Sequence, residues 1–207
     1  MLVDIKMLLI NDWYRRDITR VIEMTSTVVI LGSPRKGNSE AIAMAIANEA
    51  KAKGSTIKEY RINSLKNAKG CQSCYGCKKA GKCVVKDDIS AILDDMRAAD
   101  NIIVATPLYF GHATAQYRMV EDRFFGFLGG DFVPNIAAGK KAAIVVTCGS
   151  GIDGANKTAA EMQAALGGFL KMEIVGTIVK GGMMAPNAAE SDAAIMSEAK
   201  AIGQKLA

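Results

Sequence analysis

Short runs of apolar and β-branched residues alternate along this chain with longer segments in which apolar residues recur every three or four positions. A short unbroken run is typical of a buried parallel strand, and the longer recurrence is typical of an amphipathic helix. We therefore expect five strands, at 27–31, 56–62, 101–105, 142–147 and 173–179. Beside them we expect five helices, at 39–53, 88–99, 114–125, 158–170 and 190–206.

Regular alternation of strands and helices predicts an α/β fold, in which one doubly wound domain has a five-stranded parallel sheet covered on both faces. Ligands of such sheets lie at the carboxyl ends of the strands. The loops that follow strands are therefore the places to look for function. These loops are 32–38, 63–87, 106–113 and 148–157.

Composition narrows the class of protein. Half of the 207 residues are apolar, and no stretch approaches the roughly 20 apolar residues of a membrane span. Asp4 and Lys6 interrupt the apolar opening, which is unlike a signal peptide, so we expect a cytoplasmic protein. We interpret residues 1–26 as an N-terminal extension and 27–207 as the domain.

The net charge of +5 is spread along the chain, without the basic stripe of a nucleic-acid binder. A modest positive balance suits a phosphate-bearing cofactor or an acidic protein partner. Chance surface composition explains it equally well.

The loop after the first expected strand, GSPRKGNSEA (32–41), joins small residues, hydroxyls and two cations at the start of a helix. Converging backbone N–H groups and a helix N-terminus make such a loop a candidate phosphate site. Neither the Walker pattern nor the dinucleotide G-x-G-x-x-G pattern is present. The other interpretation is an ordinary turn with a Ser or Asn cap.

Together with ATPLYFGHATAQYRMVEDR (105–123) and TCGSG (147–151), this loop resembles the flavodoxin-like NADPH-dependent FMN reductases and the related iron–sulfur flavoproteins. The resemblance covers about 27–207 and implies strand order 2-1-3-4-5. It also implies a homodimer or homotetramer and small-molecule electron donors and acceptors. The composition and charge described above predict no membrane or nucleic-acid partner. It assigns the FMN phosphate to Ser33, Arg35, Asn38 and Ser39, with Lys36 close by.

Two further loops have the residue types that a flavin ring needs. Tyr109 and Phe110 offer flat apolar faces, and Gly111 allows close approach of the backbone. The resemblance makes Pro107, Leu108, Tyr109 and Phe110 ring contacts and places Thr147, Cys148 and Gly149 at the pyrimidine edge. The alternative for 106–112 is an ordinary loop whose aromatic residues cover the end of the sheet.

His112 is the only histidine of the chain. It is either a cation near N1 and O2 of a reduced flavin or a solvated loop side chain. A single histidine leaves no set of ligands for a hydrolytic metal site, and no nucleophile motif accompanies it.

Loop 63–87 is an insertion that contains Cys71, Cys74, Cys77 and Cys83 at the spacing C-x2-C-x2-C-x5-C. A tight C-x2-C-x2-C arrangement with a fourth cysteine is typical of a 4Fe-4S cluster, whereas zinc ribbons use two separated pairs. The spacing also resembles the cluster motif of the iron–sulfur flavoproteins. Three interpretations stay open: a 4Fe-4S cluster, metal-free thiols that include a transient disulfide, and zinc.

The expected function is an FMN-dependent oxidoreductase that takes hydride from NAD(P)H and passes electrons to a small acceptor or a redox protein, with a 4Fe-4S cluster as one route. The flavin carries this chemistry, so no catalytic side chain is expected. One alternative is a non-enzymatic electron carrier that accepts electrons from ferredoxin at the basic cysteine loop. Another is a flavin- or zinc-binding module without turnover.

Overall fold

A computed structural model describes residues 24–207 and contains the expected parallel sheet. Five strands lie in the order β2-β1-β3-β5-β6, which is the predicted order of the five expected strands, 2-1-3-4-5. Their bounds are β1 Ser26–Leu31, β2 Thr56–Arg61, β3 Asn101–Tyr109, β5 Lys141–Thr147 and β6 Glu173–Lys180. Most of the predicted extension 1–26, namely residues 1–23, lies outside the described residues.

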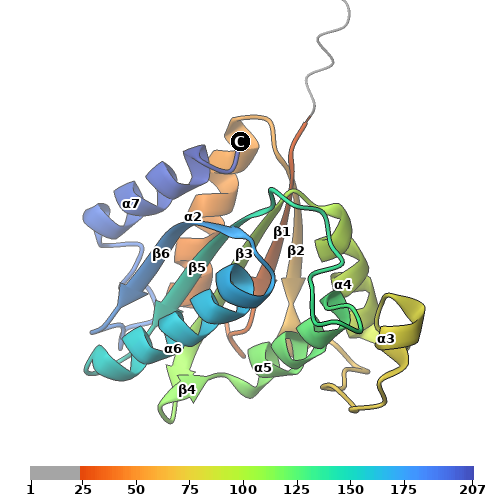
Figure 1. Cartoon of the computed structure of the whole chain (residues 1–207). Helices are drawn as coiled ribbons and strands as arrows, with labels where there is room; N and C mark the ends of the chain where they lie inside the picture. The colour runs from red at the N-terminus through yellow and green to blue at the C-terminus, as the bar shows by residue number, and fades with distance from the viewer. Residues whose placement is uncertain (1–23) are drawn as a thin grey trace, which may run out of the picture.

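Helices cover both faces of the sheet, and α7 and α2 lie on the face opposite α4, α5 and α6 (Figure 1). The bounds are α2 Asn38–Ala52, α3 Gly76–Ala80, α4 Asp88–Ala98, α5 Ala115–Glu121, α6 Asp153–Gln163 and α7 Ala193–Gln204. Short helical turns follow at η1 Ile62–Ser64, η2 Asp122–Phe127 and the π-helical η3 Ala164–Phe169. Within residues 24–207, no helix combines the length and the apolar character needed to cross a bilayer.

Two hydrophobic cores follow from this layering, because successive side chains of a strand point to opposite faces of the sheet. Val28 and Ile30 of β1 contribute to the core under α4, α5 and α6. Val29 and Leu31 contribute to the core under α2 and α7. The near-continuous burial of β1, β3 and β5 explains why these segments read as unbroken apolar runs in the sequence.

The third strand is longer than predicted. Thr106 and Pro107 stay in register with β5, and the strand then turns back through a two-residue hairpin into β4 (His112–Ala113). Phe110 and Gly111 form the tip with φ of 51° and 86°, the left-handed pair that a type I′ turn requires. Pro107 is tolerated there because β1 pairs with β3 only as far as Ala105, so that Thr106 and Pro107 are paired with β5 alone.

Helix α6 starts at Asp153, five residues before the predicted start at residue 158. Its first turn contains Gly154 and Asn156, which obscure the apolar period. Helix α3 was not predicted at all, because five residues are too few to show a helical repeat.

Candidate functional site

A cavity of about 220 Å³ opens at the carboxyl ends of β1, β3 and β5. This is the edge at which parallel α/β sheets bind ligands. Most of the residues predicted from the sequence line it, namely Ser33, Arg35, Asn38, Ser39, Pro107, Leu108, Tyr109, Thr147, Cys148 and Gly149. Lys36, Phe110 and Gly111 do not line it, whereas Gly37, Met183 and Met184 do.

The first wall is the loop 32–38 and the start of α2. Gly37 precedes the helix without a side chain to cap it, and the first intrahelical bond runs from Ala41 N to Gly37 O at 2.9 Å. The N–H groups before that bond are those that a helix leaves for an external acceptor. Arg35 is exposed beside them, so the wall offers backbone donors, a positive helix end and a guanidinium to an anion.

Glu40 is the carboxylate of that first helical turn, and its charge is compensated. Arg61 Nη2 lies 2.6 Å from Glu40 Oε1, and this hydrogen bond raises the pKa of Arg61 above its ordinary value. The ion pair leaves the positive end of α2 electrostatically favourable for a phosphate.

Asn38 has a different environment from the one its phosphate assignment implies. Its side chain is 6% exposed, and its Nδ2 donates to Met183 O at 3.1 Å and to Ala185 O at 2.7 Å. Its Oδ1 accepts from Ala189 N at 2.9 Å. The side-chain amide is therefore committed to the segment after β6.

Gly32 fixes how the first and third loops meet. Its N–H donates to Ala105 O at 2.8 Å, and its carbonyl accepts from Thr114 Oγ1 at 2.6 Å. A Cβ at this position would lie 2.6 Å from Tyr117 Cβ, which is too close for any side chain. Glycine is therefore required where β1 ends against the start of α5.

The second and third walls come from the ends of β3 and β5. Tyr109 stands at the rim of the cavity, whereas the Phe110 ring at the hairpin tip is fully exposed at 105%. Cys148 is 4% exposed, and its thiol donates toward Ser150 O and Gly151 O, both at 3.4 Å. The buried thiol thus makes its hydrogen bonds within its own loop.

His112 lies away from this cavity. It lines a second, open cavity of about 510 Å³ between α5 and α6, together with Arg118, Glu121 and Glu161. Burial raises the pKa of Glu121 above its ordinary value, although Arg118 opposes that shift.

Met183 and Met184 were missed by the sequence prediction. They belong to GGMMAPNAA (181–189), which follows the last strand and so ends at the same edge of the sheet as the other loops. Two features of the sequence could have indicated this segment. It directly follows a strand, and it begins with two adjacent glycines and two adjacent methionines.

The four cysteines of the loop differ in their surroundings. Cys71 and Cys74 are exposed, Cys77 is buried in α3, and Cys83 is half-buried. Within residues 24–207, no three His, Cys, Asp or Glu side chains gather as a metal site, and all five cysteines are free. In this conformation the four thiols of the loop are not gathered as ligands of one cluster, and we assign no electron route through them.

Arg123 attaches this loop to η2. Its side chain is fully buried, and it donates to Cys83 Sγ at 3.1 Å, to Lys69 O at 2.8 Å and to Asp87 at 3.0 Å. Burial alone would raise the pKa of Asp87, but hydrogen bonds from Arg123 and from Lys69 N outweigh it and hold that pKa below its ordinary value. The pair fixes both ends of the cysteine loop and the start of α4.

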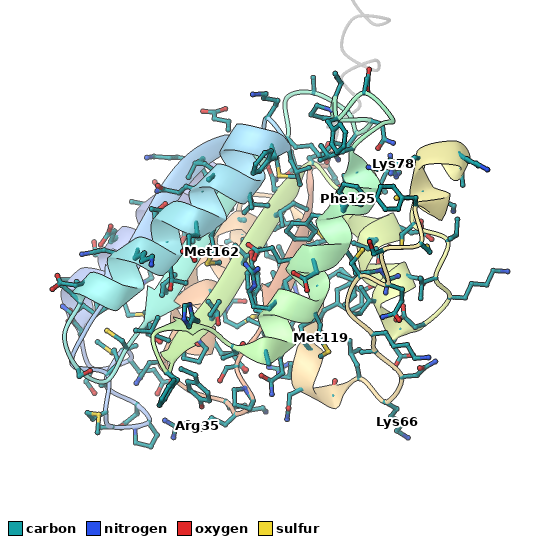
Figure 2. All side chains as sticks on the ribbon, turned by 60° about the horizontal axis from the view of Figure 1, so that its bottom comes forward. Arg35, Lys66, Lys78, Met119, Phe125 and Met162 are labelled. Carbon is teal, nitrogen blue, oxygen red and sulfur yellow. The ribbon has the colours of Figure 1, made fainter. Side chains whose placement is uncertain are left out.

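Lys78 attaches the middle of the loop. Its Nζ donates to Phe125 O and Leu128 O, each at 2.8 Å, and lies 3.5 Å from the centre of the Phe125 ring. Lys78 and Phe125 meet at the upper right of Figure 2, whereas Arg35 lies at the lower edge. Helix α3, which contains Cys77 and Lys78, and the cavity therefore occupy different parts of the molecule.

Comparison with known proteins identifies the family of this chain. Residues 25–183 match the NADPH-dependent FMN reductase family. The chain belongs to this family. The matched range contains β1 to β6 and every lining residue of the cavity except Met184.

Curated relatives of this FMN reductase family member carry the name iron–sulfur flavoprotein. One from Methanosarcina thermophila is 42% identical over 95 residues, which are 45% of this chain and 49% of the relative. One from Methanocaldococcus jannaschii is 37% identical over 94 residues, which are again 45% of this chain and 49% of the relative. The matched region thus spans about half the length of these curated relatives.

Solved structures share the fold at low sequence identity. An FMN-dependent NADH-azoreductase from Bacillus anthracis superposes with a TM-score of 0.66 at 13% identity, covering 88% of this chain and 99% of the azoreductase. An NAD(P)H:quinone oxidoreductase from Methanothermobacter marburgensis superposes with a TM-score of 0.62 at 18% identity. The superposition covers 88% of this chain and 96% of the oxidoreductase. These similarities establish the flavodoxin-like fold alone.

Proposed function

We propose that this family member is an FMN-dependent oxidoreductase that takes hydride from NAD(P)H and passes the electrons to a small acceptor or a redox protein. The observation that carries this proposal is the cavity to which the loops after β1, β3 and β5 all contribute, with an uncapped helix N-terminus at one end. Membership of the FMN reductase family supports it.

The lining residues fit FMN by their chemistry. Arg35, Ser39 and the first N–H groups of α2 would hold the phosphate, and Lys36 stands next to Arg35 in the same loop. Apolar contacts for the ring would come from Pro107, Leu108 and Tyr109, with Phe110 and Gly111 at the hairpin tip. Thr147, Cys148 and Gly149 would face its polar edge.

When bound, FMN supplies the redox chemistry by accepting hydride at N5 and releasing electrons onward. The residues that line the cavity would bind the cofactor and orient its ring. No side chain is assigned a proton transfer.

The test is FMN titration of the apoprotein followed by steady-state NAD(P)H oxidation, with a quinone as the acceptor. We expect saturable FMN binding and FMN-dependent turnover with NADH or NADPH. Binding without turnover, combined with reduction by ferredoxin, would favour the electron-carrier alternative. Absence of FMN binding would overturn the proposal.

We further propose that loop 63–87 binds a 4Fe-4S cluster after it rearranges. The cysteine spacing and the name of the curated relatives support this, and binding would require the four thiols, which are not gathered in the conformation described above, to come together. Iron and acid-labile sulfide per chain, measured without oxygen, test it. About four irons are expected in wild type and a loss in each Cys→Ser variant of the loop.

Cys148→Ser is the matched control for those variants, because Cys148 is the one cysteine outside the loop. Its iron content should equal that of wild type. Absence of iron after reconstitution would leave free thiols or zinc, which a zinc assay separates.

We also propose a cytoplasmic location and a homodimer or homotetramer. Size-exclusion chromatography with light scattering measures the subunit count directly. A monomer at micromolar concentration would contradict the oligomer.

A further inference from the structure

The segment 181–189 is attached at once to two loops of the cavity. Asn38 binds it through three hydrogen bonds, to Met183 O, Ala185 O and Ala189 N. Two neighbouring carbonyls face Nδ2 and one N–H faces Oδ1, so all the donors and one acceptor site of the amide are used. A buried amide with this pattern fixes the position of the backbone that surrounds it.

The loop after β5 binds the same segment from the other side. Met183 N donates to Cys148 O at 2.9 Å, and Cys148 N donates to Lys180 O at 2.8 Å. The Met183 side chain is 9% exposed and packs into the core under α2 and α7. The segment is thus held between the phosphate loop and the loop 147–149.

Met184 is the residue that this arrangement presents to the cavity. Its side chain lines the cavity and is 74% exposed. It also lies against Gly149, where a Cβ would come within 2.4 Å of Met184 Sδ. A flexible, polarizable thioether suits contact with a flat aromatic ligand.

From these contacts we propose that residues 181–189 form a fourth wall of the flavin cavity. In this arrangement Met184 contacts the bound flavin, and Asn38 is a positioning residue that holds the wall. The proposal rests on the proposed function and departs from the sequence interpretation, in which the Asn38 side chain binds the phosphate. It adds a specificity-determining side chain from a loop that the sequence interpretation did not include.

Riboflavin separates the two roles, because it has the ring but lacks the phosphate. FMN and riboflavin titrations of wild type, Met184→Ala, Asn38→Ala and Asn187→Ala would measure them. Asn187→Ala is the matched control, since Asn187 is exposed in the same segment. Met184→Ala should weaken both ligands by about 3- to 10-fold, as expected for a lost apolar contact, without lowering the thermal midpoint of the apoprotein.

Asn38→Ala should lower the thermal midpoint of the apoprotein, expose 181–189 to proteolysis, and weaken riboflavin as well as FMN. Weakening of FMN alone, with an unchanged apoprotein, would make Asn38 a phosphate ligand and overturn the positioning role. Unchanged binding of both ligands by Met184→Ala would overturn the fourth wall. If wild type binds FMN but either of these two results is found, only the inference about 181–189 fails. If wild type binds neither flavin, the proposed function fails with it.

Discussion

Arg35 is the exposed cation on the wall that a phosphate would meet, beside the uncapped start of α2 (Figure 2). Loss of a charge-assisted hydrogen bond to a phosphate costs about 1.5–3 kcal/mol, which corresponds to about 10- to 150-fold in affinity. We predict that Arg35→Ala raises the FMN dissociation constant by this factor and leaves the circular dichroism spectrum unchanged. A fluorescence titration of the apoprotein measures it.

Lys53→Ala is the control for Arg35→Ala. It removes the same charge at the opposite end of α2, where Lys53 is exposed. Equal weakening by both variants would mean that net charge alone attracts the ligand and that Arg35 makes no contact with it. Riboflavin affinity should be the same in Arg35→Ala and wild type.

At the scale of elements, the buried Asp87–Arg123 pair joins the cysteine loop, the start of α4 and η2. Removal of one partner of a buried ion pair costs about 3–5 kcal/mol, because the other charge stays buried without compensation. We predict a loss of this size in the free energy of unfolding for Asp87→Asn at pH 7, measured by urea denaturation.

The effect of Asp87→Asn should depend on pH. The pKa of Asp87 in the folded protein is below its ordinary value, so its stabilisation is present above the unfolded pKa of about 3.9 and is lost as pH falls through the folded pKa. The difference from wild type should therefore shrink below about pH 4. Asp94→Asn, in the helix that Asp87 caps but exposed beside Lys82, should cost less than about 1 kcal/mol at any pH. A pH-independent Asp87→Asn difference would contradict this prediction.

Helices α2 and α7 touch at Gly203. A Cβ there would lie 2.4 Å from Ile46 O and 2.7 Å from Glu49 Cβ, both on α2. Since overpacking costs about 1–3 kcal/mol, Gly203→Ala should lower the free energy of unfolding by about that amount in urea denaturation.

Gly168→Ala is the matched control for Gly203→Ala. Gly168 also lies in a helical segment, but a Cβ added there would meet nothing within 4 Å. It should be neutral or stabilise by up to about 1 kcal/mol. If both variants lose stability alike, the close contact at Gly203 is not the cause.

How far the sequence predicts these elements depends on their length and period. β1 and α4 were predicted to within one residue at each end, since their apolar patterns are unbroken. The end of β3 was missed, because Phe110 takes a left-handed turn conformation that an aromatic residue does not signal. The side-chain role of Asn38 was not predictable either, since its partners are at least 145 residues away in the sequence.

For the whole molecule, FMN binding should act as a stabilising ligand. A ligand that binds only the folded state at about 100 times its dissociation constant adds about 2.7 kcal/mol, or about 5–10 °C in Tm for a chain of this length. Differential scanning fluorimetry with increasing FMN measures the shift. A midpoint independent of FMN concentration would be incompatible with the proposed site.

The contacts of Asn38 also determine when the cavity can be completed during synthesis of the chain. A ribosome delivers the phosphate loop early, but the carbonyls of Met183 and Ala185 and the N–H of Ala189 emerge more than 140 residues later. Until then, the Asn38 amide lacks all three of these partners. A fragment ending at residue 180 would therefore contain every strand of the sheet but lack the fourth wall that we propose for the cavity.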